Sequence, residues 1–230
     1  MLTATLQVPI YAEDHRLVRE TLSSLREQHV PDDTIIEYEA WVTPSARVDP
    51  AIAAAEDAGF EVHRAPEGKL ATRNEAHNDA NGDVILSIDA DAPPIYHHTV
   101  SSMVDAIREP GTVAANSRPR SRTGPDGGVS LFNLAVDMGA VVEDVLWPHL
   151  HGQAQAFTAA AWDKAGPFDA SLDGSRLMQV RVEEERRFYK RLQEIGDVVT
   201  PREALVFNDP RRHKQRLGIG GVVPEREGSF

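Results

Sequence analysis

Two aspartates end a short apolar run, Asp83-Val-Ile-Leu-Ser-Ile-Asp-Ala-Asp91, and their spacing suggests chemistry. Side chains of an extended strand repeat every second residue, so we expect Asp89 and Asp91 to project to the same side. Two converging carboxylates repel each other unless a cation lies between them. Mg²⁺ or Mn²⁺ meets that need, and its open coordination positions can hold diphosphate oxygens. The alternative is a solvated acidic turn after a buried strand.

Strands and helices alternate around this acidic pair. The apolar pattern predicts strands at 3–10, 34–42, 60–63 and 112–116, a further strand that ends at Asp89, and helices at 14–28, 51–58, 70–81 and 99–108. This alternation is typical of an α/β domain whose mostly parallel strands are joined by right-handed crossovers. Ligands bind beyond the carboxyl ends of such strands, where Asp89, Asp91 and the segment Tyr11-Ala-Glu13 are expected.

The second half of the chain is less regular. Residues 118–128 are rich in Arg, Pro and Gly and predict a flexible loop, whereas helices are expected at 130–145, 159–165 and 183–194. Residues 152–158 read as extended, and strand-like runs occur within 198–207. Glu183, Glu184 and Glu185 are expected to begin a helix, where the positive end of the helix dipole favours carboxylates.

Length and composition exclude several classes of protein. A chain of 230 residues is long enough for a single domain with a proper core. A net charge of −12 argues against a nucleic-acid-binding protein, and the absence of cysteine excludes thiolate metal sites and fits a reducing compartment. No apolar run is long enough to span a bilayer and no signal pattern is present, so we expect a soluble, cytoplasmic protein, compatible with peripheral membrane contact.

The balance of charged residues leaves two interpretations open. The chain is acid-rich and has four lysines, Lys69, Lys164, Lys190 and Lys214. Dense carboxylates with few lysines favour adaptation to a salty cytoplasm, where salt screens their repulsion. A GC-rich genome would equally replace lysine by arginine.

Five segments, in this order, carry a resemblance to a known family. They are Pro9-Ile-Tyr11-Ala-Glu13; Gly68-Lys-Leu-Ala-Thr-Arg73-Asn74 with Ala80-Asn-Gly-Asp83; Asp89-Ala-Asp91; Gly152-Gln-Ala-Gln-Ala-Phe157 with Gly166-Pro-Phe168-Asp169; and Glu184-Glu185 ahead of Arg191-Leu192. Together they resemble the family 2 glycosyltransferases over residues 5–208. The resemblance implies the single-domain, Rossmann-like GT-A fold, with helices flanking a mostly parallel sheet, and sugar transfer from a nucleotide-diphosphate donor.

The resemblance also implies roles for individual residues. It assigns the donor to Pro9, Tyr11, Glu13, Arg73, Asn74 and Asp89, the Mn²⁺ or Mg²⁺ ion to Asp91 and Asp89, the catalytic base to Glu185 with Glu184 as second choice, and the acceptor side to Gly152 and Gln153. Relatives often place a histidine near the last core strand as a metal ligand; here Asn208 lies about there and His213 follows. Trp147 is a further acceptor-side candidate.

Several of these assignments have structural alternatives. Arg73 can instead form an internal ion pair with Asp83 or Glu75, Tyr11 can simply pack at a strand end, and Asn74 can bond loop backbone. In this family the second strand commonly ends in acids that read the base, whereas here it ends Trp41-Val-Thr-Pro-Ser45. The sequence therefore does not identify the base.

The combined interpretation is a metal-dependent inverting glycosyltransferase that acts on a glycan, lipid-linked or protein acceptor. Residues 1–117 are expected to form the donor half, 118–208 the acceptor half, and 209–230 a basic tail that either folds over the donor as a flap or stays solvated. The alternatives are a non-catalytic GT-A-like binding domain and a sugar nucleotidyltransferase. The second normally needs a Gly-rich loop after the first strand, and residues 9–14 contain no glycine.

Overall fold

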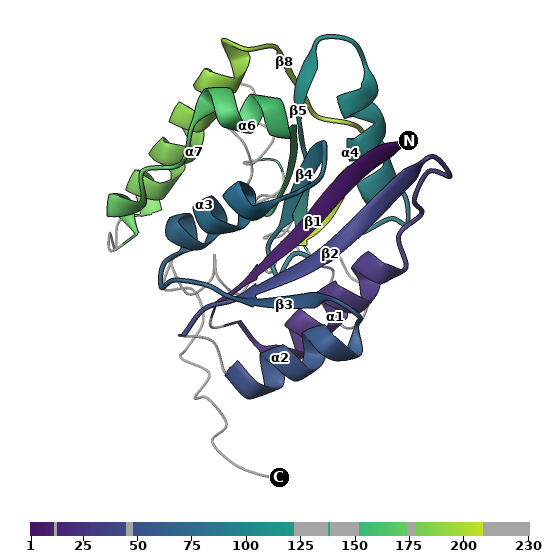
Figure 1. Ribbon diagram of the computed structural model, residues 1–230, viewed down its shortest axis with the longest axis vertical. Coiled ribbons are helices and arrows are strands. Elements are labelled where there is room, and N and C mark those ends of the chain that lie inside the picture. Colours follow the sequence, from purple (N-terminus) through teal and green to yellow (C-terminus); the bar gives the residue numbers. More distant parts are fainter. Residues whose placement is uncertain (12, 45–47, 122–137, 139–151, 174–177, 209–230) are drawn as a thin grey trace.

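The structure is a computed structural model that describes residues 1–11, 13–44, 48–121, 138, 152–173 and 178–208 (Figure 1). Its main sheet has seven strands in the order β3-β2-β1-β4-β7-β5-β8. These strands are β1 (Leu2–Ile10), β2 (Thr34–Val42), β3 (Glu61–Arg64), β4 (Val84–Ile88), β5 (Thr112–Asn116), β7 (Ala154–Thr158) and β8 (Asp197–Val199). Neighbouring strands are parallel except at β7, which runs antiparallel to β4 and β5. The expected mostly parallel α/β sheet is therefore confirmed.

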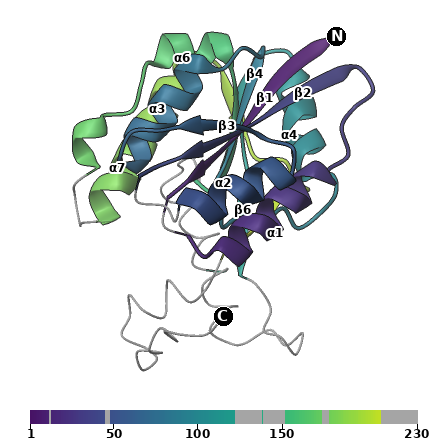
Figure 2. The same ribbon diagram turned by 60° about the horizontal axis from the view of Figure 1, so that its bottom comes forward.

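Helices cover both faces of this sheet, as Figures 1 and 2 show. They are α1 (His15–Arg26), α2 (Val48–Asp57), α3 (Lys69–Asp79), α4 (Thr99–Arg108), α6 (Ala159–Ala165) and α7 (Met178–Gln193), with a short 3₁₀ helix η1 (Ala170–Leu172). In the part of the chain that the structure describes, no helix is both long and apolar enough to cross a bilayer.

Strand alternation explains the two helical layers. In β4, Val84, Leu86 and Ile88 pack in the cluster that contains residues of α1, α2 and α4, whereas Ile85 packs in the cluster with residues of α3, α6 and α7. Phe157 of β7 lies opposite Ile85 in register and joins the same second cluster. Successive side chains therefore point to opposite faces, and both faces are buried, as expected for a sheet of this type.

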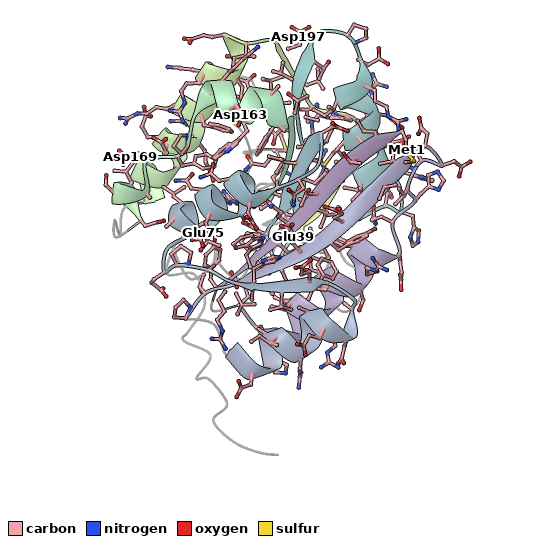
Figure 3. The ribbon with its side chains drawn as sticks, in the orientation of Figure 1. Met1, Glu39, Glu75, Asp163, Asp169 and Asp197 are labelled. Atoms are coloured by element: carbon pink, nitrogen blue, oxygen red, sulfur yellow. The ribbon has the colours of Figure 1, made fainter. Side chains whose placement is uncertain are left out.

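A polar network lies on the α3 face of the sheet. Gln7 of β1 donates from Nε2 to Glu39 Oε2 at 2.9 Å and also to the backbone carbonyl of Ala76 in α3. Trp41 Nε1 donates to the same Glu39 oxygen at 2.9 Å (Glu39 is labelled in Figure 3). Burial raises the pKa of Glu39, and the hydrogen bonds from Trp41 and Gln7 oppose that rise. The carboxylate of Glu39 in β2 therefore bonds to groups inside the protein.

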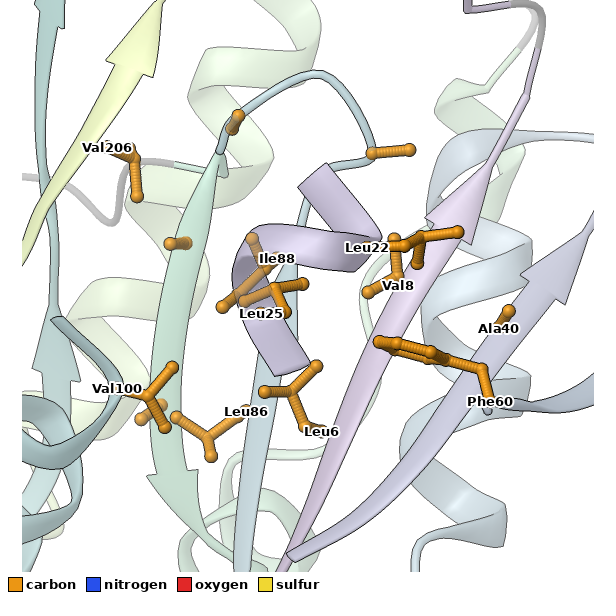
Figure 4. Packing of buried hydrophobic residues seen from close by; sticks show 14 of the residues in the cluster. Leu6, Val8, Leu22, Leu25, Ala40, Phe60, Leu86, Ile88, Val100 and Val206 are labelled. Carbon is orange, nitrogen blue, oxygen red and sulfur yellow. The ribbon is translucent and has the colours of Figure 1, made fainter. Parts of the chain in front are cut away.

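The opposite face holds the larger apolar cluster (Figure 4). Leu22 and Leu25 of α1 pack against Leu6 and Val8 of β1, and each of these four side chains is at most 1% exposed. Asp14 begins α1 by accepting the N–H of Arg16 at 2.9 Å, as its sequence position predicts. Burying leucine-sized side chains stabilises the fold by roughly 2 kcal/mol each, so this layer fixes β1 and β4 as a rigid base.

Two predictions differ most clearly from the structure. Helix α7 begins at Met178, five positions before the glutamates expected to start it, so Glu183, Glu184 and Glu185 lie well inside the helix. The positive end of the helix dipole lies too far from these three carboxylates to stabilise them. Residues 118–121, expected as loop, form strand β6 (Arg118–Ser121), which pairs in parallel with β9 (Leu205–Asn208) in a separate two-stranded sheet.

Helix α3 is capped by a residue far away in the sequence. Its N-cap residue, Gly68, has no side chain to accept the first N–H groups, and its φ of 110° suits glycine. Asp173, just after η1, accepts the N–H groups of Leu70 and Ala71 at 2.8 Å each. An anion at a helix N-terminus is stabilised by the free N–H groups and the dipole. This contact therefore ties α3 to the segment that leads to α7.

We expect Asp173→Ala to lower the free energy of unfolding by about 1 kcal/mol, the usual cost of losing a helix cap. Tm should fall by roughly 2–4 °C for a chain of this size, which differential scanning calorimetry resolves. The exposed Asp163 of α6 provides the control, because Asp163→Ala removes the same charge without removing the acceptor of the α3 N–H groups. Equal melting temperatures for the two variants would contradict the capping role.

Candidate active site

Several of the residues singled out by the sequence lie at one edge of the main sheet. Tyr11 follows the carboxyl end of β1, and Asp89 follows that of β4. Gly152 and Gln153 reach the same edge because β7 is antiparallel, so its beginning lies beside the end of β4. The N–H of Asp89 donates to the carbonyl of Gln153 at 2.8 Å, which joins the two segments directly.

Arg73 of α3 is the centre of this edge. Its side chain is completely buried, and Nη2 donates to Asp89 Oδ1 at 2.7 Å and to the carbonyl oxygen of Gly152. Nη1 lies 3.4 Å from Glu185 Oε1 of α7. Arg73 therefore pairs internally, but with Asp89 and Glu185 rather than with Asp83 or Glu75. A buried guanidinium with two carboxylate partners is strongly held in place.

Asp89 has a second cationic partner, Lys69, whose Nζ lies 2.9 Å from Oδ2. Burial would raise the pKa of Asp89, but attraction and hydrogen bonds from Lys69 and Arg73 outweigh it and lower that pKa. Asp89 is thus held as a carboxylate with one oxygen on each cation. Sequence reasoning missed Lys69 as a site residue; its position directly after Gly68, at the start of α3, was the available signal.

Asp89 and Asp91 lie after strand β4 rather than along it, so strand periodicity does not set the directions of their side chains. Strand β4 ends at Ile88, and the aspartates lie in the following turn, closed by a bond from the N–H of Ala92 to the carbonyl of Asp89 at 3.0 Å. Asp89 is 7% exposed and faces its cationic partners, whereas Asp91 is only partly buried. The turn therefore gives the two carboxylates different surroundings.

Glu13 completes the acidic side of this edge. Burial raises its pKa to about 7, opposed by the N–H of Tyr11, and the charges of Asp91 and Asp89 raise it further. The backbone N–H of Tyr11 donates to Glu13 Oε2 at 2.6 Å, and the Tyr11 hydroxyl donates to the carbonyl of Lys69 at 2.9 Å. The Tyr11 hydroxyl therefore links the loop after β1 to the start of α3, while the Glu13 carboxylate bonds the backbone of its own loop.

The edge fits a divalent cation that is bound together with a phosphate ligand. Among the residues the structure describes, no group of three His, Cys, Asp or Glu side chains could hold a metal ion. Mg²⁺ sites in nucleotide enzymes need only one or two carboxylates, since substrate phosphates and water complete the coordination. Asp91 is the better candidate, because it is more exposed than Asp89 and therefore more accessible to an ion with a phosphate ligand. Electrostatic crowding around Glu13 also favours a positive charge nearby.

The two glutamates of α7 have different surroundings. Glu184 is 1% exposed; its Oε1 accepts the N–H of Asp169 at 3.0 Å and lies 3.5 Å from Arg191 Nη2. Glu185 is 14% exposed at its side chain and contacts Arg73. Glu184 thus holds the loop before η1, and Glu185 is the one of the two that shares the edge with Asp89.

Asn74 bonds loop backbone, the alternative that the sequence left open. Its Nδ2 donates to the carbonyl of Phe168 at 2.8 Å, and its Oδ1 accepts the N–H of the same residue at 2.9 Å. Pro9 is buried within β1. Both Trp147 and His213, together with the basic tail, lie outside the described residues.

Comparisons with known proteins agree with this arrangement. Residues 5–156 match the family described as Glycosyl transferase family 2, which is well over half of the chain. The chain belongs to this family. A comparison with curated proteins returned no match.

Solved structures show the same fold. The mannosyltransferase PcManGT from Pyrobaculum calidifontis, in complex with GDP-Man and Mn²⁺, is 20% identical with a TM-score of 0.63 over 89% of this chain and 56% of its own. Glucosyl-3-phosphoglycerate synthase from Mycobacterium tuberculosis, with Mn²⁺, UDP and phosphoglyceric acid, is 16% identical with a TM-score of 0.61 over 95% and 74%. S. aureus TarS 1–349 with UDP-GlcNAc is 16% identical with a TM-score of 0.59 over 90% and 58%.

These likenesses confirm the GT-A fold for this family member. The chain spans between about half and three quarters of the chains it matches, including 56% of the mannosyltransferase. The remaining parts of those proteins have no counterpart in the match. These neighbours therefore show the fold of this chain and do not show its ligands.

The raised pKa of Glu13 predicts a pH-dependent effect of Glu13→Gln. The pKa of Glu13 is near 4.5 in the unfolded chain and about 7 in the folded protein, so the fold favours the protonated carboxyl. This contribution to stability is complete below pH 4.5 and is lost as the pH rises through 7. Glu13→Gln should therefore raise the free energy of unfolding little at pH 4 and by on the order of 3 kcal/mol at pH 8. Urea titrations at both pH values measure this.

The exposed Glu37 of β2 supplies the control, since Glu37→Gln removes one negative charge at a solvated position. An effect of Glu13→Gln that is the same at pH 4 and pH 8 would contradict the burial of an ionisable carboxyl at this site.

Proposed function

We propose that the chain is a divalent-cation-assisted, inverting glycosyltransferase that uses a nucleoside-diphosphate sugar. The observation that carries the proposal is the buried bridge of Arg73 between Asp89, at the end of β4, and Glu185, inside α7. Asp89 lies at the edge proposed for the donor, and Glu185 lies on a different element but contacts the same arginine. Family membership supports the reaction class, and the neighbours' complexes with GDP-Man, UDP-GlcNAc and UDP-Glc support the donor class.

The donor half, residues 1–117, would hold the nucleotide diphosphate against the edge formed after β1 and β4. Asp91, with Asp89 behind it, would hold the Mn²⁺ or Mg²⁺ ion. When bound, that ion would neutralise the diphosphate as the glycosidic bond breaks. Lys69 already lies beside Asp89, so a cationic side chain stands at the same edge.

Glu185 would act as the general base. The acceptor hydroxyl would form a new bond to the anomeric carbon while the bond from that carbon to the diphosphate oxygen breaks, and Glu185 would take the hydroxyl proton. Attack opposite to the leaving diphosphate inverts the anomeric centre. The acceptor half, 118–208, would bring a glycan, lipid-linked sugar or protein, with Gly152 and Gln153 at its border.

Two variants separate donor binding from chemistry. A thermal-shift screen of UDP-, GDP- and TDP-sugars with and without Mn²⁺ selects the donor, because a ligand that binds the native state raises Tm. Asp91→Asn should lose the Mn²⁺-dependent part of that shift. Glu185→Gln should keep the shift and lower donor hydrolysis, with water as acceptor, by roughly 10²-fold or more. Mass spectrometry of the released nucleotide measures the second effect.

Each other outcome points to a different conclusion. Pyrophosphate release in place of a nucleoside diphosphate would favour a sugar nucleotidyltransferase. Absence of any donor-dependent shift would favour a non-catalytic binding domain. Unchanged hydrolysis in Glu185→Gln would remove this residue as the base.

A further inference from the structure

We propose that Arg73 is a positioning residue that sets the place of the Glu185 carboxylate, and that Gly152 lacks a side chain because this ion pair fills the space beside it. The inference deepens the proposed function and rests on Glu185 as the base. It concerns how the base is held, and it gives Arg73 a role inside the protein in place of direct contact with the donor.

The contacts of Arg73 leave it little freedom. Its guanidinium is completely buried, and Nη2 is fixed on one side by Asp89 Oδ1 at 2.7 Å and by the carbonyl of Gly152. Asp89 is itself held by Lys69 at 2.9 Å. Nη1 is directed toward Glu185 Oε1, at 3.4 Å, and the buried Nε has no hydrogen-bond partner among the described residues. The guanidinium plane of Arg73 therefore fixes the position of the Glu185 carboxylate relative to the end of β4.

Burial and charge favour this arrangement over a fortuitous contact. Burial would lower the pKa of Arg73, but the neighbouring Asp89, then Tyr11 and Glu185, raise it, so the guanidinium stays charged in the interior. Removing either carboxylate would leave a buried cation under-compensated, which is costly. The pairing thus couples the carboxylate on α7 to the carboxylate after β4.

Gly152 forms the wall on the other side of this pair. A Cβ at position 152 would overlap Glu185 Oε1 and would lie 3.0 Å from Arg73 Nη1 and 3.1 Å from Arg73 Nη2. The backbone of Gly152 lies outside the left-handed region, so alanine can adopt it without strain. The nearest atom met is the far end of the Glu185 side chain, which is 14% exposed and is held less firmly than the guanidinium. Gly152→Ala should therefore fold and displace the carboxylate, with no charge removed.

The test measures donor affinity and turnover separately in Gly152→Ala. We expect the Mn²⁺-dependent dissociation constant of the selected donor to stay within about twofold, because Asp89 and Asp91 are untouched. The rate of donor hydrolysis should fall at least tenfold, since an ångström of misplacement at a catalytic group is costly.

Gly196→Ala is the matched control. Its Cβ would lie 2.5 Å from Val113 Cγ1 and 2.6 Å from the carbonyl oxygen of Gly111, a comparably tight place between α7 and β8. This control should lower Tm and leave turnover unchanged below the melting transition. A loss of turnover in Gly152→Ala that merely follows its loss of stability, as in the control, would overturn the proposal.

Glu185→Gln separates the proposed function, in which Glu185 is the base, from the positioning role of Arg73. If Glu185→Gln abolishes hydrolysis while Gly152→Ala turns over at the wild-type rate, the positioning role fails and the proposed function stands. If Glu185→Gln itself retains the wild-type rate, the proposed base is wrong and the positioning role falls with it.

Discussion

The ion pairs of one buried arginine determine how the functional edge of this protein is built. Arg73 bonds Asp89 after β4 and the carbonyl before β7, and it contacts Glu185 in α7. A guanidinium without compensating charges is costly to bury, so carboxylates must lie near it. The same requirement brings Asp89, proposed for the donor, and Glu185, proposed as the base, to opposite sides of one guanidinium.

The rest of the fold positions this arginine. Strands β1 and β4 are clamped between two helical layers, so their carboxyl ends form a fixed edge. Helix α3, which carries Lys69 and Arg73, has its N-terminus capped by Asp173 and is joined to the next loop by Asn74. Polar contacts therefore hold α3 at its start, while apolar packing holds the strands.

The sequence predicted what local periodicity controls. Strands 34–42 and 112–116 and helices 99–108 and 159–165 have the expected bounds, because their apolar spacing and flanking turn residues agree. Helix α7 starts earlier than expected because its first turns, from Met178, carry no cap signal, while the following glutamates imitate a helix start. Strand β6 was missed because Arg118-Pro-Arg-Ser has no apolar alternation and forms only through pairing with β9.

Long-range contacts at the site could not be predicted in the same way. Asp173 caps a helix that begins about a hundred positions earlier, and Lys69 pairs with Asp89 only because the ends of α3 and β4 meet in space. The family resemblance assigned Asp89, Arg73 and Glu185 to one site, but it did not show that the arginine lies between the two carboxylates. Such pairings depend on tertiary packing, which one-dimensional patterns do not encode.

The most direct measurement is a crystal structure with a nucleoside diphosphate and Mn²⁺. We expect Asp91 to coordinate the ion while Asp89 keeps its bonds to Lys69 and Arg73, and we expect Arg73 still to contact Glu185. A structure in which the arginine turns outward onto the diphosphate, and the α7 carboxylate is held by other groups, would contradict this expectation.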